Sequence, residues 1–274
     1  SILNQTFKDF EFLIVYDEST DETLSIIQGF QEQDERVVLI NGDKEGISGA
    51  LNKGIEKARG KYIARLDADD ISLPTRFETQ INHMESLGLD ICGGHSLLID
   101  SDGKVNGIGV VPRSHDLCGL SMMFMVPFAH SSVMILKSFL IDSSLKYIGK
   151  YEDFDLWARM FSAGAKFGNV DDAVVKYRVL NESLSTVHAA GSRRDTRRVL
   201  KTFRIEHQQY VSSMIKNLDI DLLSEKEKSL VARYLLNRAI TRFDLFGLYR
   251  LKDITLRSVV ITLLSEIRRL VVIH

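Results

Sequence analysis

The chain has 274 residues, of which 45% are hydrophobic and 26% charged, with a formal net charge of −2, as in an ordinary globular protein with a sizeable core. Cys92 and Cys118 are far apart and lack CxxC spacing, which argues against a disulfide scaffold or zinc knuckle and favours a reducing compartment. No uninterrupted apolar run reaches about 18 residues, so no membrane-spanning helix is expected.

The first part of the chain alternates the patterns of strands and helices. Apolar runs of strand length occur at residues 10–15, 36–41, 61–66 and 89–94. Helical patterns separate them at residues 19–33, 47–60 and 74–87, with Gly60 as an expected helix end and Pro74 as an expected helix start. This alternation predicts βαβ units, and therefore an α/β fold with a mainly parallel, Rossmann-like sheet and helices on both faces.

The pattern changes after residue 95. Residues 96–110 predict a hairpin that turns at Asp102 and Gly103. A strand at 131–137, a helix at 151–164 and a late strand at 173–180 follow. From about Ser192 onward the chain is predicted to be helical, because it contains no Pro and very little Gly.

Three carboxylates, Asp67, Asp69 and Asp70, directly follow the run at 61–66, and Asp17 follows the run at 10–15 in the same way. Ligands of parallel sheets bind beyond the carboxyl ends of the strands, so these acids predict a site for a cation and a phosphorylated ligand. A divalent ion such as Mg²⁺ or Mn²⁺ would relieve their mutual repulsion. The alternative is ordinary turn and capping chemistry.

Residues 1–23, 46–78 and 151–160 together resemble the family 2 glycosyltransferases of the GT-A fold, many of which make bacterial capsule, exopolysaccharide or lipopolysaccharide sugars. The resemblance runs in order from Ser1 to about Val187. It implies a GT-A domain over residues 1–188, followed by a basic helical extension over residues 189–274. It also implies a cytoplasmic location. Members of the family begin with an additional strand, so the first strand is expected to be missing here.

The resemblance implies roles for the acids at the strand ends. Asp17 matches the residue that reads the nucleotide base, and Arg65 lies where a basic residue approaches the nucleotide. Asp67 and Asp69 match the DxD motif of the nucleotide-sugar site, and the Mn²⁺ or Mg²⁺ ligand is expected to be Asp69 or Asp70. Family members have Asp-Asp-Gly-Ser where this chain has Tyr-Asp-Glu-Ser at residues 16–19, so the nucleotide, expected to be UDP, stays open.

Further residues match the acceptor side of the family's site. Asp153 matches the catalytic base of the inverting enzymes, and Glu152 beside it is expected to shape the acceptor site. The alternative for Asp153 is a partner of the helix dipole in a first turn. His188 falls where some relatives place a ligand to the metal or the diphosphate. His130 is interpreted either as facing the acceptor or as a hydrogen-bonded structural residue, and Trp157 as a core residue.

The C-terminal part carries a different charge from the rest. From Ala189 onward lie 17 of the 35 basic residues but only 9 of the 37 acidic ones. Residues 193–204 place several of these cations on one helical face, which indicates either a solvated surface or a contact with anionic lipid headgroups, at the inner face of the plasma membrane, or with a lipid-diphosphate acceptor. Nucleic-acid binding fits poorly, because aromatic residues are not interleaved with the cations.

The sequence therefore predicts a metal-dependent, inverting glycosyltransferase that moves a sugar from a nucleotide sugar to a glycan or lipid-linked acceptor. Transfer needs charge neutralisation at the leaving diphosphate, a positioned base for the acceptor hydroxyl, and exclusion of water. The alternatives are a truncated or degenerate domain that binds the donor without turnover, a DxD phosphatase of the haloacid dehalogenase type, and a nucleotidyltransferase. A nucleotidyltransferase needs a Gly-rich, Arg-containing loop early in the chain, and this sequence has none.

Overall fold

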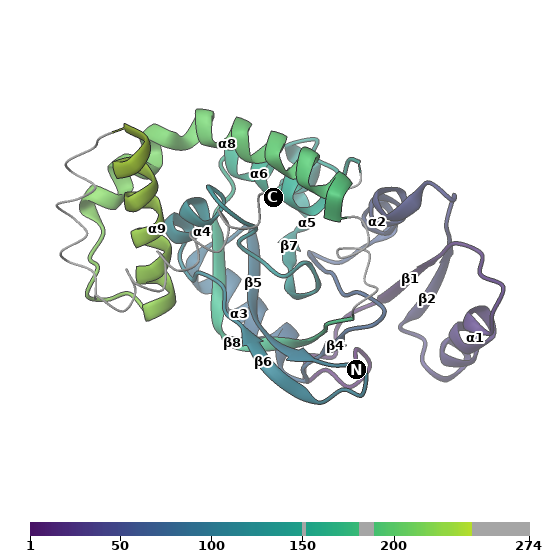
Figure 1. Ribbon diagram of the computed structural model, residues 1–274. Coiled ribbons are helices and arrows are strands. Elements are labelled where there is room, and N and C mark those ends of the chain that lie inside the picture. Colours follow the sequence, from purple (N-terminus) through teal and green to yellow (C-terminus); the bar gives the residue numbers. More distant parts are fainter. Residues whose placement is uncertain (150–151, 181–188, 243–274) are drawn as a thin grey trace. The chain divides into compact units, whose positions relative to one another are not determined.

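The computed structural model describes residues 1–149, 152–180 and 189–242 (Figure 1). Its strands are β1 (Phe12–Tyr16), β2 (Val37–Asn41), β3 (Tyr62–Ala64), β4 (Ile71–Ser72), β5 (Ile91–Ile99), β6 (Val105–Gly109), β7 (Met134–Leu136) and β8 (Phe167–Arg178). Its helices are α1 (Thr23–Gln33), α2 (Gly46–Lys57), α3 (Arg76–Leu87), α4 (His115–Ser121), the short 3-10 helix η1 (His130–Ser132), α5 (Lys137–Asp142), α6 (Glu152–Ser162), α8 (Ala189–Asn217) and α9 (Glu225–Arg242). The predicted alternation over the first 94 residues is confirmed.

The strands that the structure describes form two sheets. Strands β1 and β2 pair in parallel as a sheet of their own. The six others follow the order β3-β7-β5-β8-β4, with β6 paired to β5. In this larger sheet β5 and β8 run parallel, whereas the remaining pairs are antiparallel. The α/β class is confirmed, but the expectation of mainly parallel pairing is wrong for the larger sheet. A strand joined to its neighbour by a tight turn, such as β6, must run antiparallel to it.

Local backbone chemistry explains most of the element boundaries. The hairpin turns where it was predicted, with Gly103 at φ 81°. The carboxylate of Asp100 accepts the N–H groups of Asp102 and Lys104 at 3.0 and 2.9 Å in this turn. Helix α3 ends at Gly88, which has φ 61°.

Helix α2 ends at Lys57, three residues before the predicted end at Gly60. The carboxylate of Glu11 accepts the N–H of Arg59 at 2.5 Å and that of Gly60 at 3.2 Å. These backbone groups are satisfied outside the helix, so the helix stops early.

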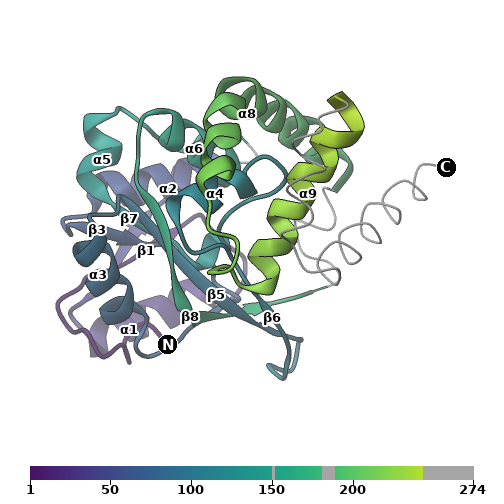
Figure 2. The ribbon, with the colours of Figure 1, turned by 90° about the vertical axis from the view of Figure 1, so that its left-hand side faces the viewer.

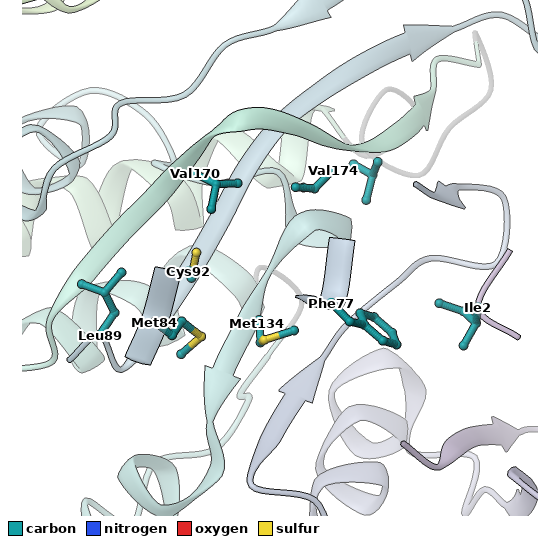
Figure 3. Close-up of a cluster of buried hydrophobic side chains, with 9 residues drawn as sticks. Ile2, Phe77, Met84, Leu89, Cys92, Met134, Val170 and Val174 are labelled. Carbon is teal, nitrogen blue, oxygen red and sulfur yellow. The ribbon is translucent and has the colours of Figure 1, made fainter. Parts of the chain in front are cut away.

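The core lies where α3 packs on β5 and β8 (Figure 2). Figure 3 shows its buried side chains, which come from the N-terminal segment, α3, the connection from α3 to β5, and strands β5, β7 and β8: Ile2, Phe77, Met84, Leu89, Cys92, Met134, Val170 and Val174. Full burial of one such aliphatic side chain contributes about 1.5–3 kcal/mol. Because α3 begins shortly after the acidic cluster, this packing also fixes where the cluster stands.

The chain divides into two compact units. The first contains residues 1–113 and 128–199, and therefore both sheets. The second joins residues 114–127 to the chain from Leu200 onward, and in it α4 packs against α9. The predicted boundary after residue 188 borders residues outside the described part, so it stays a prediction. Within the described ranges, no helix combines the length and apolar character that a membrane span needs.

Candidate active site

The acid loop, residues 65–70, begins where β3 leaves the sheet. The N–H of Arg65 donates to the carbonyl of Val133 at 2.9 Å, which extends the β3–β7 pairing by one residue. The chain then turns, and the N–H of Asp70 donates to the carbonyl of Asp67 at 3.2 Å. One turn at the end of a strand therefore carries all three carboxylates, in agreement with the sequence pattern.

The three carboxylates have different surroundings. Asp69 is exposed, whereas Asp70 is only 7% exposed. One Asp70 oxygen accepts the N–H of Arg178 at 2.7 Å, and the other is buried without a hydrogen-bond partner in the described part of the chain. Burial raises the pKa of Asp70, and the charges of Asp67 and Asp69 raise it further, against the hydrogen bonds that it accepts. Only Asp69 is fully accessible to an incoming ligand.

Arg65 and Ser131 hold the first acid of the loop. Asp67 Oδ2 accepts a hydrogen bond from Ser131 Oγ at 2.8 Å and another from Arg65 Nη1. The Arg65 side chain is 8% exposed and also reaches Ser131 Oγ at 3.3 Å. A direct role of Arg65 at the nucleotide stays a prediction. In this arrangement its guanidinium serves as the buried counter-charge of Asp67.

Asp17 lies at the carboxyl end of β1, in the smaller sheet. Its Oδ1 accepts the N–H of Lys44 at 3.0 Å, and Lys44 has the positive φ of 58° that side chains other than glycine rarely adopt. A Cβ on Gly42 would lie 1.9 Å from Asp17 Oδ1, so a larger residue here would displace that carboxylate. Among the described residues, no hydrogen bond or ion pair joins Asp17 to the acid loop or to Asp153.

Helix α2 connects the Asp17 region to the segment that precedes α6. The Asn52 side chain donates to the carbonyl of Tyr147 and accepts its N–H, both at 2.9 Å. Ser48 Oγ donates to the carbonyl of Gly149 at 2.6 Å. These bonds link residues about a third of the chain apart and hold α2 against the segment that leads into α6.

Helix α6 begins with the two acids predicted for catalysis. Asp153 is half-buried, and its Oδ1 accepts the N–H of Phe154 at 2.7 Å. Burial raises the pKa of Asp153, while that hydrogen bond and the charge of Arg65 lower it and Asp67 raises it. Burial also raises the pKa of Glu152. Asp153 therefore lies within the electrostatic reach of the acid loop.

An aromatic cluster lies behind these acids. His130 Nε2 is 3.1 Å from the Tyr147 hydroxyl, and its Nδ1 is 3.9 Å from a Glu152 oxygen. Burial and the charge of Arg65 hold the pKa of His130 well below its ordinary value, so this residue is neutral at physiological pH. The structural interpretation of His130 therefore fits better than acceptor binding. Trp157 is 0% exposed and packs edge-on against the His130 ring, which confirms it as a core residue.

Sequence reasoning missed Ser131, Tyr147 and Arg76. Their partners are distant in the sequence and are brought close only by the fold: Ser131 bonds Asp67, 64 positions away, and Tyr147 bonds Asn52, 95 positions away. A serine or a tyrosine in an apolar segment carries no signal of its own. Arg76 had a signal, since an arginine that opens an otherwise apolar helix face must find partners inside the protein.

The described residues supply some, but not all, of the ligands that a divalent metal needs. Within residues 1–149, 152–180 and 189–242, no three His, Cys, Asp or Glu side chains gather as a ready cage, and His188 lies outside the described residues. Mg²⁺, however, is commonly held by one or two carboxylates together with substrate phosphates. The exposed carboxylate of Asp69 and the unpartnered oxygen of Asp70 are oxygen donors of this kind. The residues therefore fit a metal that arrives with a phosphorylated donor.

Comparison with known proteins decides the family. Residues 1–140 match the family described as "Glycosyl transferase family 2". The O-antigen biosynthesis glycosyltransferase WbnJ of Escherichia coli is 31% identical over 188 residues, which cover 67% of this chain and 73% of WbnJ. The chain belongs to glycosyl transferase family 2. This membership removes the phosphatase and nucleotidyltransferase alternatives.

Two other relatives of this family 2 chain are informative. The uncharacterized glycosyltransferase MJ1057 of Methanocaldococcus jannaschii is 34% identical over 189 residues, or 66% of this chain and 64% of that protein. This chain therefore spans less than two thirds of that relative. An Escherichia coli protein, the UDP-Glc:alpha-D-GlcNAc-diphosphoundecaprenol beta-1,3-glucosyltransferase WfaP, is 33% identical and matches 68% of this chain and 72% of its own length.

Solved structures confirm the fold. Staphylococcus aureus TarS 1–349, in complex with UDP-GlcNAc, matches with a TM-score of 0.58 at 19% identity, over 88% of this chain and 67% of TarS 1–349. The mannosyltransferase PcManGT of Pyrobaculum calidifontis, in complex with GDP-Man and Mn²⁺, matches with a TM-score of 0.53 at 14% identity, over 92% of this chain and 72% of that chain. The family 2 chain thus has the GT-A fold.

Proposed function

We propose that this chain is a metal-dependent, inverting glycosyltransferase that moves a sugar from a UDP-sugar to a hydroxyl of a lipid-linked or growing glycan in surface polysaccharide synthesis. The observation that carries the proposal is the position of residues 130 and 131 between the two sets of acids: Ser131 Oγ donates to Asp67 at 2.8 Å, and His130 Nδ1 lies 3.9 Å from Glu152, the neighbour of Asp153. This arrangement supports one site made of acids from two distant segments, as a donor site and an acceptor base require. The relative WfaP, named for UDP-glucose and a diphosphoundecaprenol acceptor, supports the choice of donor and acceptor.

Asp153 is the proposed base for the acceptor hydroxyl. In a single displacement, the acceptor oxygen attacks the anomeric carbon as the bond to the leaving UDP breaks, and the acceptor proton passes to a carboxylate. Asp153 is half-buried, and burial raises its pKa, while the charge of Arg65 lowers it. Glu152 is more deeply buried, at 7% exposed, so its proposed role is to shape the acceptor side.

The donor side is assigned to the strand ends. Asp17 would read the base, and Asp67 with Asp69 would face the diphosphate. Asp69 and Asp70 would hold the divalent ion, Mn²⁺ or Mg²⁺, which when bound neutralises the charge of the leaving diphosphate. Deep burial of Asp70 and its bond to the Arg178 backbone restrict it to a fixed orientation.

Donor hydrolysis tests the proposal. Purified protein is incubated with UDP-, GDP- and dTDP-sugars and Mn²⁺, and nucleotide release is compared between wild type and Asp69→Asn. We expect release from a UDP-sugar by wild type and a large loss in the variant. Equal release by both proteins would contradict the metal assignment.

A second candidate is a domain that binds the nucleotide sugar without turnover. The absence of a ready three-acid cage among the described residues favours it. Tight UDP-sugar binding by wild type without nucleotide release or transfer would decide for this alternative.

A further inference from the structure

A fully buried guanidinium lies beneath the acid loop. Arg76 is the first residue of α3 and is 1% exposed. Its Nη2 donates to the carbonyl of Arg65 at 2.8 Å and to that of Val133 at 3.1 Å. The Arg76 side chain therefore connects the start of the acid loop to Val133, which lies between η1 and β7.

Gln80, one helical turn later, extends the same network. Arg76 Nε donates to Gln80 Oε1 at 2.9 Å. Gln80 Nε2 in turn donates to the carbonyls of Ser132 at 2.8 Å and Cys92 at 3.1 Å. The pair thus fixes backbone from β5, from the end of β3, and from the turn that carries Ser131. Ser131 and Arg65 are the two residues that hold the carboxylate of Asp67.

A buried cation of this kind is an unusual choice for packing alone. Burying a charge is costly unless it is paired, and no carboxylate contacts Arg76 directly among the described residues. Burial lowers the pKa of Arg76 to about 9, helped by the charge of Arg65 and opposed by that of Asp70, so the side chain is still charged at neutral pH. Its Nη1 is buried without a partner in the described part, as is Asp70 Oδ2. The guanidinium therefore lies at the start of the acid loop, bonded there to backbone carbonyls, with Nη1 lacking a partner in the described part of the chain.

We propose that Arg76 is a positioning residue for sugar transfer: its guanidinium fixes the backbone at Arg65 and Val133, and so holds Asp67 and Asp69 in place for the donor diphosphate. The inference rests on the proposed function, because it assigns the geometry of that donor site to a residue that does not touch the donor. Misplacement of a reacting or binding group by about 1 Å can cost about a hundredfold in rate.

Two variants separate positioning from stability. Arg76→Met removes the charge and the fork but keeps the apolar length, and it leaves the buried acceptors Gln80 Oε1 and the Arg65 carbonyl without this donor, at some cost in stability. Arg76→Lys keeps the charge and loses the two-carbonyl fork. Arg36→Met is the control for loss of an arginine, because Arg36 pairs with Asp34 at 2.7 Å before β2, outside the site. Steady-state kinetics with donor, acceptor and Mn²⁺, together with thermal unfolding, are measured on the full chain.

For Arg76→Met we expect a folded protein with a lower melting temperature than wild type, a donor KM about tenfold higher, a kcat about a hundredfold lower and an unchanged acceptor KM. We expect the kcat and donor KM of Arg76→Lys to lie between those of Arg76→Met and wild type, and those of Arg36→Met to match wild type. Wild-type kcat and donor KM in either folded Arg76 variant would overturn the inference. So would failure of both variants to fold, since Arg76 would then be a stability residue. Absence of turnover in wild type would instead overturn the proposed function, which keeps the two failures distinct.

Discussion

Asp153 has the position and the environment of a general base. It lies in the first turn of α6, is half-buried, and is within the electrostatic reach of Arg65 and Asp67. A residue that served only the helix dipole would need neither burial nor these neighbours. Glu152, one position earlier, is turned into the protein beside His130. Adjacent acids therefore have different surroundings, which is how two carboxyl groups take different roles.

Asp153→Asn should abolish transfer and leave donor binding intact. Loss of a general base typically costs about 10²- to 10⁴-fold in kcat. UDP affinity, measured by calorimetry, should stay within about twofold of wild type. Glu152→Gln is the matched control and should lower kcat much less. An Asp153→Asn enzyme with wild-type kcat would refute the assignment of the base.

The pH dependence of kcat follows from the same residue. A base acts only when it is ionised, and burial raises the pKa of Asp153 above the ordinary 3.8. As the pH falls through this raised value the carboxylate takes up a proton, so kcat should decline on the acidic side at a higher pH than for an exposed aspartate. The decline should be absent from the residual rate of Asp153→Asn.

At the scale of elements, the turn after β2 brings Gly42 against the Asp17 carboxylate. The Cβ of an alanine at residue 42 would lie 1.9 Å from Asp17 Oδ1, and only the end of that side chain can move away. Gly42→Ala should therefore displace the Asp17 carboxylate with little loss of stability, and raise the donor KM about tenfold. Gly29→Ala in α1 is the control, because its Cβ meets nothing within 4 Å and it should stabilise the helix by about 0.5–1 kcal/mol. A donor KM unchanged in Gly42→Ala would argue against a base-reading role for Asp17.

Strands β1 and β3 each have one edge without a strand partner among the described residues. Glu11, just before β1, binds the backbone of Arg59 and Gly60 just before β3, so the two strands start near each other. Backbone amides on these edges have no strand partner in the described part of the chain, so amide hydrogen exchange in β1 should be faster than in β5, which is paired on both sides. Exchange in β1 as slow as in β5 would contradict this pairing.

The sequence predicted the elements that local chemistry determines. Apolar runs located β1, β2, β3 and β5, and Gly103 located the hairpin turn, because each signal lies within a few residues of its effect. It could not predict that Arg76 would bond the carbonyl of Val133, 57 positions away, or that Asn52 would hold Tyr147. Such contacts depend on the order of strands in the larger sheet, which no local pattern encodes. Strand direction was mispredicted for the same reason.

At the scale of the whole molecule, basic residues outnumber acidic ones in the C-terminal part of the chain. Arg197, Arg198 and Lys201 are exposed on α8. We propose that they contact anionic lipid headgroups, at about 1 kcal/mol for each cation near the surface. The protein should sediment with phosphatidylglycerol vesicles and not with phosphatidylcholine vesicles, and added salt or the triple change to glutamate should release it. Equal sedimentation with both vesicle types would count against an electrostatic membrane contact.

The central claim is that carboxylates at the end of β3 bind a donor diphosphate together with a divalent ion. Calorimetric titration of UDP into wild type and Asp69→Asn, each with and without Mn²⁺, tests it most directly. The account predicts that wild type binds UDP at least tenfold more tightly with Mn²⁺, and that Asp69→Asn loses this gain. UDP binding of equal strength with and without Mn²⁺ in wild type would contradict the claim.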